Sequence, residues 1–199
     1  MRRDGFCGWG ILLRSVTTLR ALLGAVLLLL LAEEAAAAQA GEISLPWVGQ
    51  KSATECGRAV LASLAARRGG DAEAFYRRLP PPPDAEHGYS IAEMQHFGAE
   101  VGVHLTLKVP QGVVIAGECL PAPSATAYFK KLAGLVRASQ PVVVPVDSRP
   151  GSGHYLVLVG ADRGDFTVLD PASPGLRRIP DLQLAALMCS FGYIALVSR

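Results

Sequence analysis

The chain is poor in the residues that build metal centres. It has four cysteines and four histidines in 199 residues, no C-x-x-C pair, and histidines scattered along the chain. A structural zinc site needs four such ligands at short, regular spacings. We therefore expect no metal and no other cofactor.

The chain also lacks a strong charge of either sign. Four of the 19 Lys and Arg residues and three of the 17 Asp and Glu residues precede Gly41, so the remainder is almost neutral. Recognition of nucleic acid depends on clustered positive charge. We therefore expect no nucleic-acid partner.

The first forty residues have the pattern of an export signal. Four arginines precede an apolar run from Ala21 to Ala32, and small residues follow from Ala35 to Ala40. This order is typical of a secretory signal peptide, with cleavage predicted after Ala38-Gln39-Ala40. An uncleaved anchor is the alternative, which would attach the protein to the inner membrane facing the periplasm. In both cases residues 41–199 form one domain outside the cytoplasm, periplasmic or secreted.

The remaining segment predicts helices first and strands later. Capping-box patterns begin helices at Ser52-x-x-Glu55 (about Ala53 to Arg68) and at Ser90-x-x-Glu93, and Asp71 caps a shorter helix between them. A helix is expected over Ala125 to Ser139 and another over Asp181 to Met188. Strands are expected over 104–109, 141–146, 155–159, 166–169, 176–179 and 193–197. This order is an α+β pattern, with N-terminal helices packed on an antiparallel sheet.

Three cysteines remain after the leader: Cys56, Cys119 and Cys189. An odd number in an oxidising compartment predicts one disulfide and one free thiol. Cys119 and Cys189 are the expected pair, because Cys56 has a reason to stay free.

Cys56 lies in the first turn of the helix that follows Ser52. Unpaired backbone N–H groups at a helix start stabilise a thiolate, which is a nucleophile. Gln50 precedes the helix, where its amide can donate to the oxyanion beside the Cys56 N–H. Such a thiol is expected to be partly exposed, whereas the alternative is a buried core cysteine.

His154 begins an apolar strand, and Asp170 ends the strand that returns from it. A five-residue loop, Gly160 to Gly164, would place the two side chains directly opposite each other. A carboxylate there would hold an imidazole base in its working tautomer. A tighter Arg163-Gly164 turn would shift the register by three residues. A surface histidine and a strand-ending turn are the alternatives.

Taken together, Gln50-x5-Cys56-Gly57, Gly153-His154-Tyr155 and Leu169-Asp170-Pro171 resemble the double-glycine leader peptidases. That family is the bacteriocin-processing branch of the papain-like cysteine peptidases. The resemblance spans about Trp47 to Val197 and includes Gly88-Tyr89-Ser90. It implies a papain-like fold, with Cys56 as nucleophile, His154 as general base, Asp170 as the orienting residue and Gln50 as oxyanion donor.

The expected function is cleavage of a peptide bond in another protein exported by the same cell. The enzyme could serve as accessory factor of a secretion or fibre-assembly system. Two alternatives remain: an acyltransferase like the phytochelatin-synthase group, and a peptide-binding module without catalysis. The sequence identifies neither the substrate nor the oligomeric state.

Overall fold

The computed structural model describes residues 42–83, 86–110, 119, 122–149 and 152–199. The predicted signal peptide or anchor, residues 1–40, lies outside the described residues and stays a prediction. Within the described part, no helix combines the length and the apolar character needed to cross a membrane.

The N-terminal half is helical, as predicted. The helices are α2 (Cys56–Ala66), α3 (Ala72–Arg78) and α4 (Ile91–Glu100). Asp71 caps α3 by accepting a hydrogen bond from the Glu73 N–H, and Ser90 and Glu93 form the predicted capping box at α4. Gly69 and Gly70 both have positive φ after α2, a conformation that glycine adopts without the strain of a Cβ.

Helix α2 is the central helix of this half. Nine of its 11 residues are buried, and it contacts α3, α4 and strand β3. A helix that is apolar on all sides belongs in a core. The N-terminus of α2, where Cys56 lies, is therefore held from several directions.

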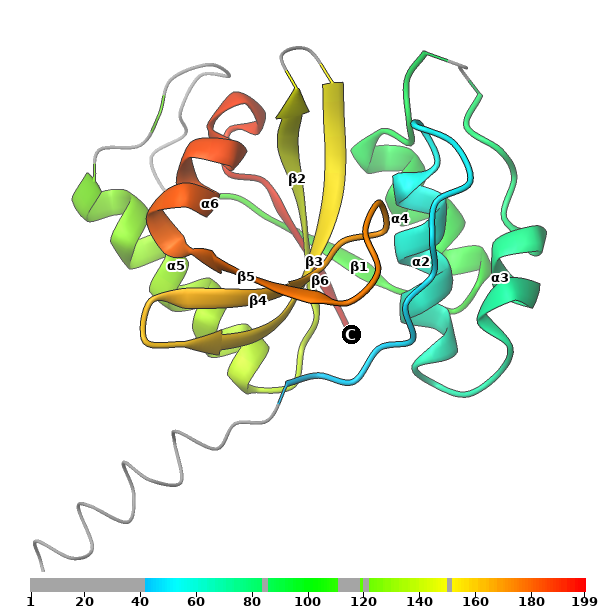
Figure 1. Cartoon of the computed structure of the whole chain (residues 1–199), viewed down its shortest axis with the longest axis horizontal. Coiled ribbons are helices and arrows are strands. Elements are labelled where there is room, and N and C mark those ends of the chain that lie inside the picture. The colour runs from blue at the N-terminus through cyan, green and yellow to red at the C-terminus, as the bar shows by residue number, and fades with distance from the viewer. Residues whose placement is uncertain (1–41, 84–85, 111–118, 120–121, 150–151) are drawn as a thin grey trace, which may run out of the picture. The chain divides into compact units, whose positions relative to one another are not determined.

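The second half forms one antiparallel sheet of six strands in the order β1-β6-β2-β3-β4-β5. Strands β2 and β3 form a long hairpin that extends beyond the rest of the sheet (Figure 1). The strands are β1 (Leu105–Lys108), β2 (Val142–Arg149), β3 (Ser152–Asp162), β4 (Asp165–Leu169), β5 (Leu176–Pro180) and β6 (Ala195–Ser198).

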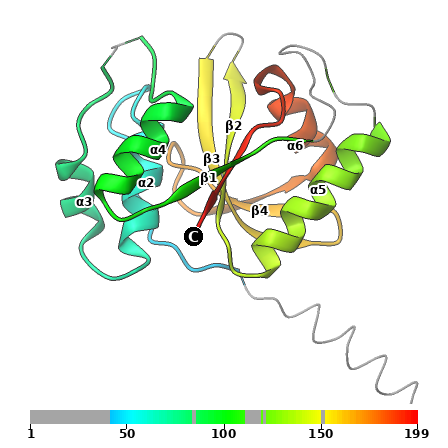
Figure 2. The ribbon, with the colours of Figure 1, turned by 180° about the vertical axis from the view of Figure 1, so that it is seen from behind.

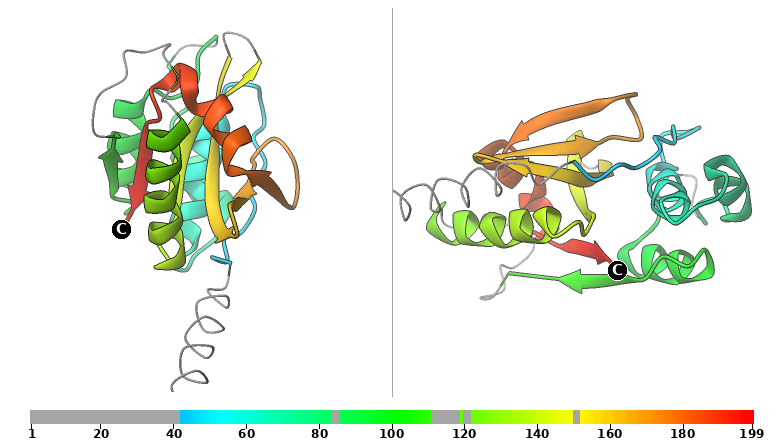
Figure 3. Two further views of the ribbon diagram at one scale, coloured as in Figure 1. Left: turned by 90° about the vertical axis from the view of Figure 1, so that its left-hand side faces the viewer. Right: turned by 90° about the horizontal axis from the view of Figure 1, so that it is seen from below.

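Helices cover the sheet in two groups. Helices α2, α3 and α4 lie together on one side of the β2–β3 hairpin, and α5 (Ala122–Arg137) and α6 (Asp181–Met188) on the other (Figures 1 and 2). The view from below shows the same separation (Figure 3). Contacts of α2 with β3, and of α6 with β2 and β5, leave the β2–β3 hairpin between the two groups. The α+β architecture is therefore confirmed.

The predicted disulfide is confirmed, and so is the free thiol. Cys119 is bonded to Cys189, the first residue of the short 3-10 helix η1 (Cys189–Phe191) that follows α6. Among the described cysteines, Cys56 is free. The last strand begins two residues later than predicted, because Tyr193 has a positive φ and continues the turn after η1.

Candidate active site

Cys56 is the first residue of α2, but the capping box predicted before it is wrong. The cap residue is Glu55, which makes no side-chain capping bond, and residues 52–54 form a turn whose Ser52 carbonyl accepts from the Glu55 N–H at 3.3 Å. The helix therefore begins three residues later than expected. Its first N–H groups have no side-chain cap, which favours negative charge beside Cys56.

The burial of Cys56 also differs from the prediction. The residue is 2% exposed and belongs to the core cluster, so the thiol is not partly exposed. The cause is close packing by the loop before α4. A Cβ on Gly88 would lie 2.8 Å from the Thr54 carbonyl oxygen and 3.9 Å from Cys56 Sγ. This backbone therefore approaches the Thr54 carbonyl at a distance that only glycine permits, and it covers the thiol at van der Waals contact.

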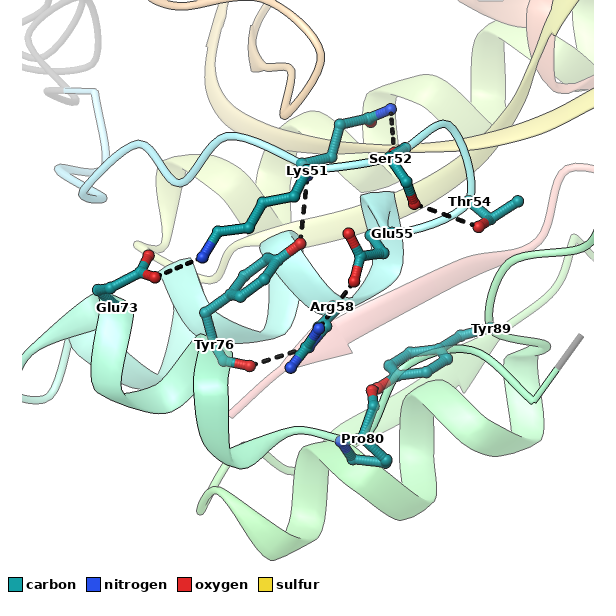
Figure 4. Close-up of polar contacts among 10 residues, drawn as sticks. Lys51, Ser52, Thr54, Glu55, Arg58, Glu73, Tyr76, Pro80 and Tyr89 are labelled. Carbon is teal, nitrogen blue, oxygen red and sulfur yellow. Dashed lines mark hydrogen bonds and ion pairs between the residues drawn. The ribbon is translucent and has the colours of Figure 1, made fainter. Parts of the chain in front are cut away.

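Three charged or polar side chains, Glu55, Arg58 and Tyr76, fix the turn before Cys56 through contacts that the sequence did not predict (Figure 4). Arg58 donates to Glu55 Oε1 at 2.7 Å and to the Tyr76 carbonyl at 2.9 Å, and its guanidinium lies over the Tyr76 ring. Tyr76 OH accepts from the Lys51 N–H at 3.2 Å. Burial would raise the pKa of Glu55, but the Arg58 and Tyr76 hydrogen bonds hold it below its ordinary value. The network ties the loop before α2 to α3.

His154 and Asp170 form a buried hydrogen-bonded pair. His154 Nε2 lies 2.8 Å from Asp170 Oδ1, and the two residues are 8% and 6% exposed. Asp170 also accepts from the Ala172 N–H at 2.8 Å and from Arg177 at 2.6 Å. The Arg177 contact has no signal in the sequence, because nothing there indicates which β5 side chain reaches the end of β4.

The register that brings this pair together is not the one predicted. Strands β3 and β4 are joined by the tight Arg163-Gly164 turn, with Asp162 opposite Asp165. A bulge then leaves Val159 without an opposite residue, since Leu158 pairs with Val168 and Gly160 with Thr167.

Beyond the bulge the two side chains are diagonal neighbours on one face of the sheet. Val157 pairs with Leu169. If this register continues past the end of β4, Asp170 lies two residues away from the position directly opposite His154. Diagonal neighbours in an antiparallel pair lie within reach of long or aromatic side chains. The predicted contact is therefore present, but the directly opposed geometry is wrong.

The charges around His154 favour its protonated form. Burial alone would lower the pKa of His154, but hydrogen bonds to Asp170 and Cys56, and the negative charges of both, raise it to about 9. Burial would raise the pKa of Asp170, but the His154, Ala172 and Arg177 contacts lower it. Because Nε2 is engaged by Asp170, the other ring nitrogen, Nδ1, is left for Cys56.

Gln50 lies in the extended segment that precedes α2. Its backbone N–H donates to the Pro171 carbonyl at 3.0 Å, and Trp47 Nε1 donates to the Asp170 carbonyl at 2.9 Å. Gln50 Nε2 donates to the Ser52 carbonyl at 3.0 Å, while Oε1 is buried without a hydrogen-bond partner among the described residues. An amide nitrogen carries two hydrogens, so one N–H of Gln50 remains available.

The fold therefore brings all four predicted residues together around the His154 side chain. Gln50, His154 and Asp170 line a common cavity, and Cys56 lies close enough to His154 to raise its pKa. Within the described part of the chain, no group of three or more His, Cys, Asp or Glu side chains could hold a metal ion.

Comparison with solved structures finds the same fold. The chain is similar to a double glycine motif protease from an AMS/PCAT transporter, solved in complex with the leader peptide. The identity is 18%, over 80% of this chain and 94% of that one, with a TM-score of 0.53. It is also similar to the peptidase domain of Streptococcus ComA, a bi-functional ABC transporter involved in a quorum-sensing pathway. Here the identity is 19%, over 79% and 98%, with a TM-score of 0.53.

Comparisons at the level of sequence find less. No family model matches the chain, and neither does any curated protein. At these identities the structural similarity establishes the fold alone, which is the α+β fold of these double glycine motif peptidase domains.

Proposed function

We propose that this chain is an exported cysteine peptidase, with Cys56 as nucleophile and His154 as general base. Asp170 orients His154, and Gln50 stabilises the oxyanion. The observation that carries the proposal is the buried 2.8 Å hydrogen bond between His154 and Asp170, with the Cys56 side chain close enough to the same ring to raise its pKa. A nucleophile, a base and an orienting carboxylate in this order are the requirements of covalent acyl transfer.

In this proposal each reacting atom has one role. His154 Nε2–H donates to Asp170, so Nδ1 accepts the proton of Cys56 and an imidazolium–thiolate pair forms. The thiolate attacks the peptide carbonyl carbon. The oxyanion that forms accepts hydrogen bonds from the Cys56 backbone N–H and from the free side-chain N–H of Gln50. His154 then gives its proton to the departing amine nitrogen as the C–N bond breaks. Water, activated by the same imidazole, releases the acyl group from Cys56 Sγ.

The Cys119–Cys189 disulfide supports a location outside the cytoplasm, because such bonds persist in oxidising compartments. The proposed substrate is a peptide segment of another protein exported by the same cell. In this proposal the enzyme is periplasmic or secreted, attached to the membrane only if residues 1–40 are retained. Its task is that of an accessory factor in secretion or fibre assembly.

The test is cleavage of a peptide library by residues 41–199 with the disulfide intact. We expect mass spectrometry to detect new peptide ends with the wild type, none with Cys56→Ala, and almost none with His154→Ala. The matched control is His96→Ala, because His96 is exposed on α4 and pairs with Glu100. Circular dichroism checks the fold of Cys56→Ala, since this residue is buried.

Two outcomes decide between the candidate activities. Equal activity of Cys56→Ala and wild type in a secretion or assembly assay would exclude both peptidase and transferase. Products joined to an added amine, in preference to hydrolysed peptides, would indicate an acyltransferase instead.

A further inference from the structure

A cavity of about 470 Å³ opens beside the His154–Asp170 pair. Gln50, His154 and Asp170 belong to its lining, with Ala53 and Ala172 from the adjoining turns, and the rest comes from β2, β3, β5 and α6. Cys56 is missing from the described residues that line it. Helix α6 lies across the β2–β3 hairpin from α2 (Figure 1), so the cavity extends from His154 toward α6, away from the helix that carries Cys56.

This position assigns the cavity to one half of a substrate. In the proposed reaction the acyl half becomes bonded to Cys56, whereas the amine half leaves with a proton from His154. The amine half must therefore begin within hydrogen-bond reach of His154 and continue away from Cys56. The cavity lies in that direction, so it fits the residue that follows the cleaved bond.

The walls of the cavity favour a long side chain with an aliphatic stem. Val146 and Leu156, from the β2–β3 hairpin, are buried beneath it, and Leu187 of α6 is half-buried at its side. Apolar surface of this kind packs against the methylene groups of lysine or arginine while their charged ends reach a polar rim.

The charges of the cavity favour a cation at that rim. Asp170 is hydrogen-bonded to both His154 and Arg177. The positive charges of protonated His154 and Arg177 are balanced by the negative charges of Asp170 and the proposed Cys56 thiolate. Asp147, on β2, is the remaining acidic side chain of the lining.

Asp147 has a partner that orients it without neutralising it. Its Oδ2 accepts a hydrogen bond from the Ser190 hydroxyl of η1, and it forms no ion pair with the described residues. The disulfide at Cys189 fixes η1 next to this contact. Among the described side chains, one negative charge therefore remains unbalanced in the cavity.

We propose that this cavity binds a lysine or arginine side chain at the residue directly after the cleaved bond. The aliphatic stem lies on Val146, Leu156 and Leu187, and the cationic end pairs with Asp147. This inference rests on the proposed peptidase function and names the substrate feature that the same site selects.

The experiment uses blocked peptides randomised on both sides of the cleaved bond, followed by two matched peptides. These peptides differ only in lysine or glutamine after the cut. We expect lysine and arginine to be enriched there, and kcat/KM to be roughly fivefold higher for the lysine peptide, the size of one partly exposed ion pair. Asp147→Asn should reduce this ratio to about one. Asp165→Asn, at the opposite end of β4 from Asp170, should retain the wild-type ratio.

A second variant avoids any effect of Asp147 on folding. Gln183→Lys adds a cation to an exposed position of the same lining and should lower the lysine preference with the Ser190 contact intact. Cleavage by the wild type with no preference after the cut, or a preference unchanged in both variants, would overturn the inference and leave the peptidase function standing. Absence of any Cys56-dependent cleavage would contradict the function, and the cavity assignment with it.

Discussion

Replacing Asp170 by asparagine should lower the pKa of His154 while preserving the shape of the site. The Asp170 carboxylate accepts a hydrogen bond from His154 Nε2 at 2.8 Å, and both this bond and the negative charge favour the imidazolium. An asparagine side chain has the same size but no charge. Its NH₂ group can also donate to the ring nitrogen, which favours the neutral imidazole.

The magnitude follows from the shift in the folded protein. The pKa of His154 rises from 6.5 to about 9, and each pKa unit corresponds to about 1.4 kcal/mol, so the protonated ring contributes about 3 kcal/mol. Because the folded-state pKa is the higher one, this stability is complete below pH 6.5 and is lost as the pH rises through 9. The bond to Cys56 remains in Asp170→Asn. We therefore expect the variant to lose roughly 2 kcal/mol more at pH 6 than at pH 9.5.

Two measurements check this expectation. Imidazole NMR should show His154 titrating near pH 9 in the wild type and closer to pH 6.5 in Asp170→Asn, and urea unfolding at pH 6 and 9.5 should give the difference in stability. Asp162→Asn is the matched control, because Asp162 pairs with Arg178 at an exposed site 3.3 Å apart. Titration of His154 near 6.5 in the wild type, or at the same pH in both proteins, would refute the reasoning.

Three further changes probe the oxyanion, the packing of α2 and the disulfide. Gln50→Ala removes one proposed oxyanion donor and should lower kcat by roughly 10²- to 10³-fold in peptide cleavage, with unchanged unfolding; an unaffected kcat would remove Gln50 from the mechanism. Gly57→Ala should destabilise by about 1–3 kcal/mol in urea unfolding, because its Cβ would lie 2.8 Å from a methionine sulfur. Gly134→Ala, with nothing within 4 Å of the added carbon, should be neutral or stabilising, and equal effects of the two would contradict the packing argument. Replacing Cys119 and Cys189 by serine opens a link between residues 70 apart and should cost about 4 kcal/mol; a much smaller loss would indicate an unfolded state that remains compact.

Local signals in the sequence predicted most of the elements correctly. Ser90 with Glu93, and Asp71 before α3, marked helix starts that the structure confirms, because a cap depends on a few neighbouring residues. The same reasoning was wrong at Ser52. There Glu55 is engaged by Arg58 and Tyr76, and Tyr76 comes from another helix, so the helix start depends on tertiary contacts.

The four proposed site residues were chosen from local patterns and from the resemblance, with Gln50 and Cys56 at a predicted helix start and His154 and Asp170 at predicted strand ends. Their supporting contacts were not predictable in this way. Arg177 reaches Asp170 only because β5 pairs with β4, and Gly88 approaches Cys56 only because a loop packs over the start of α2. Such contacts depend on the packing of distant elements, which a single sequence does not specify.

The contact between His154 and Asp170 depends on a single extra residue in β3. With the tight turn alone, the two residues would be three positions out of register and would lie on opposite faces of the sheet, because side chains alternate along a strand. The bulge at Val159 reduces the offset to two, which returns both side chains to one face. The Val159 carbonyl accepts a hydrogen bond from the Ile43 N–H at 2.6 Å, so the N-terminal segment satisfies the unpaired residue. The position of a bulge cannot be predicted from a uniformly apolar run such as Tyr155 to Val159, so the predicted pairing had the right residues and the wrong register.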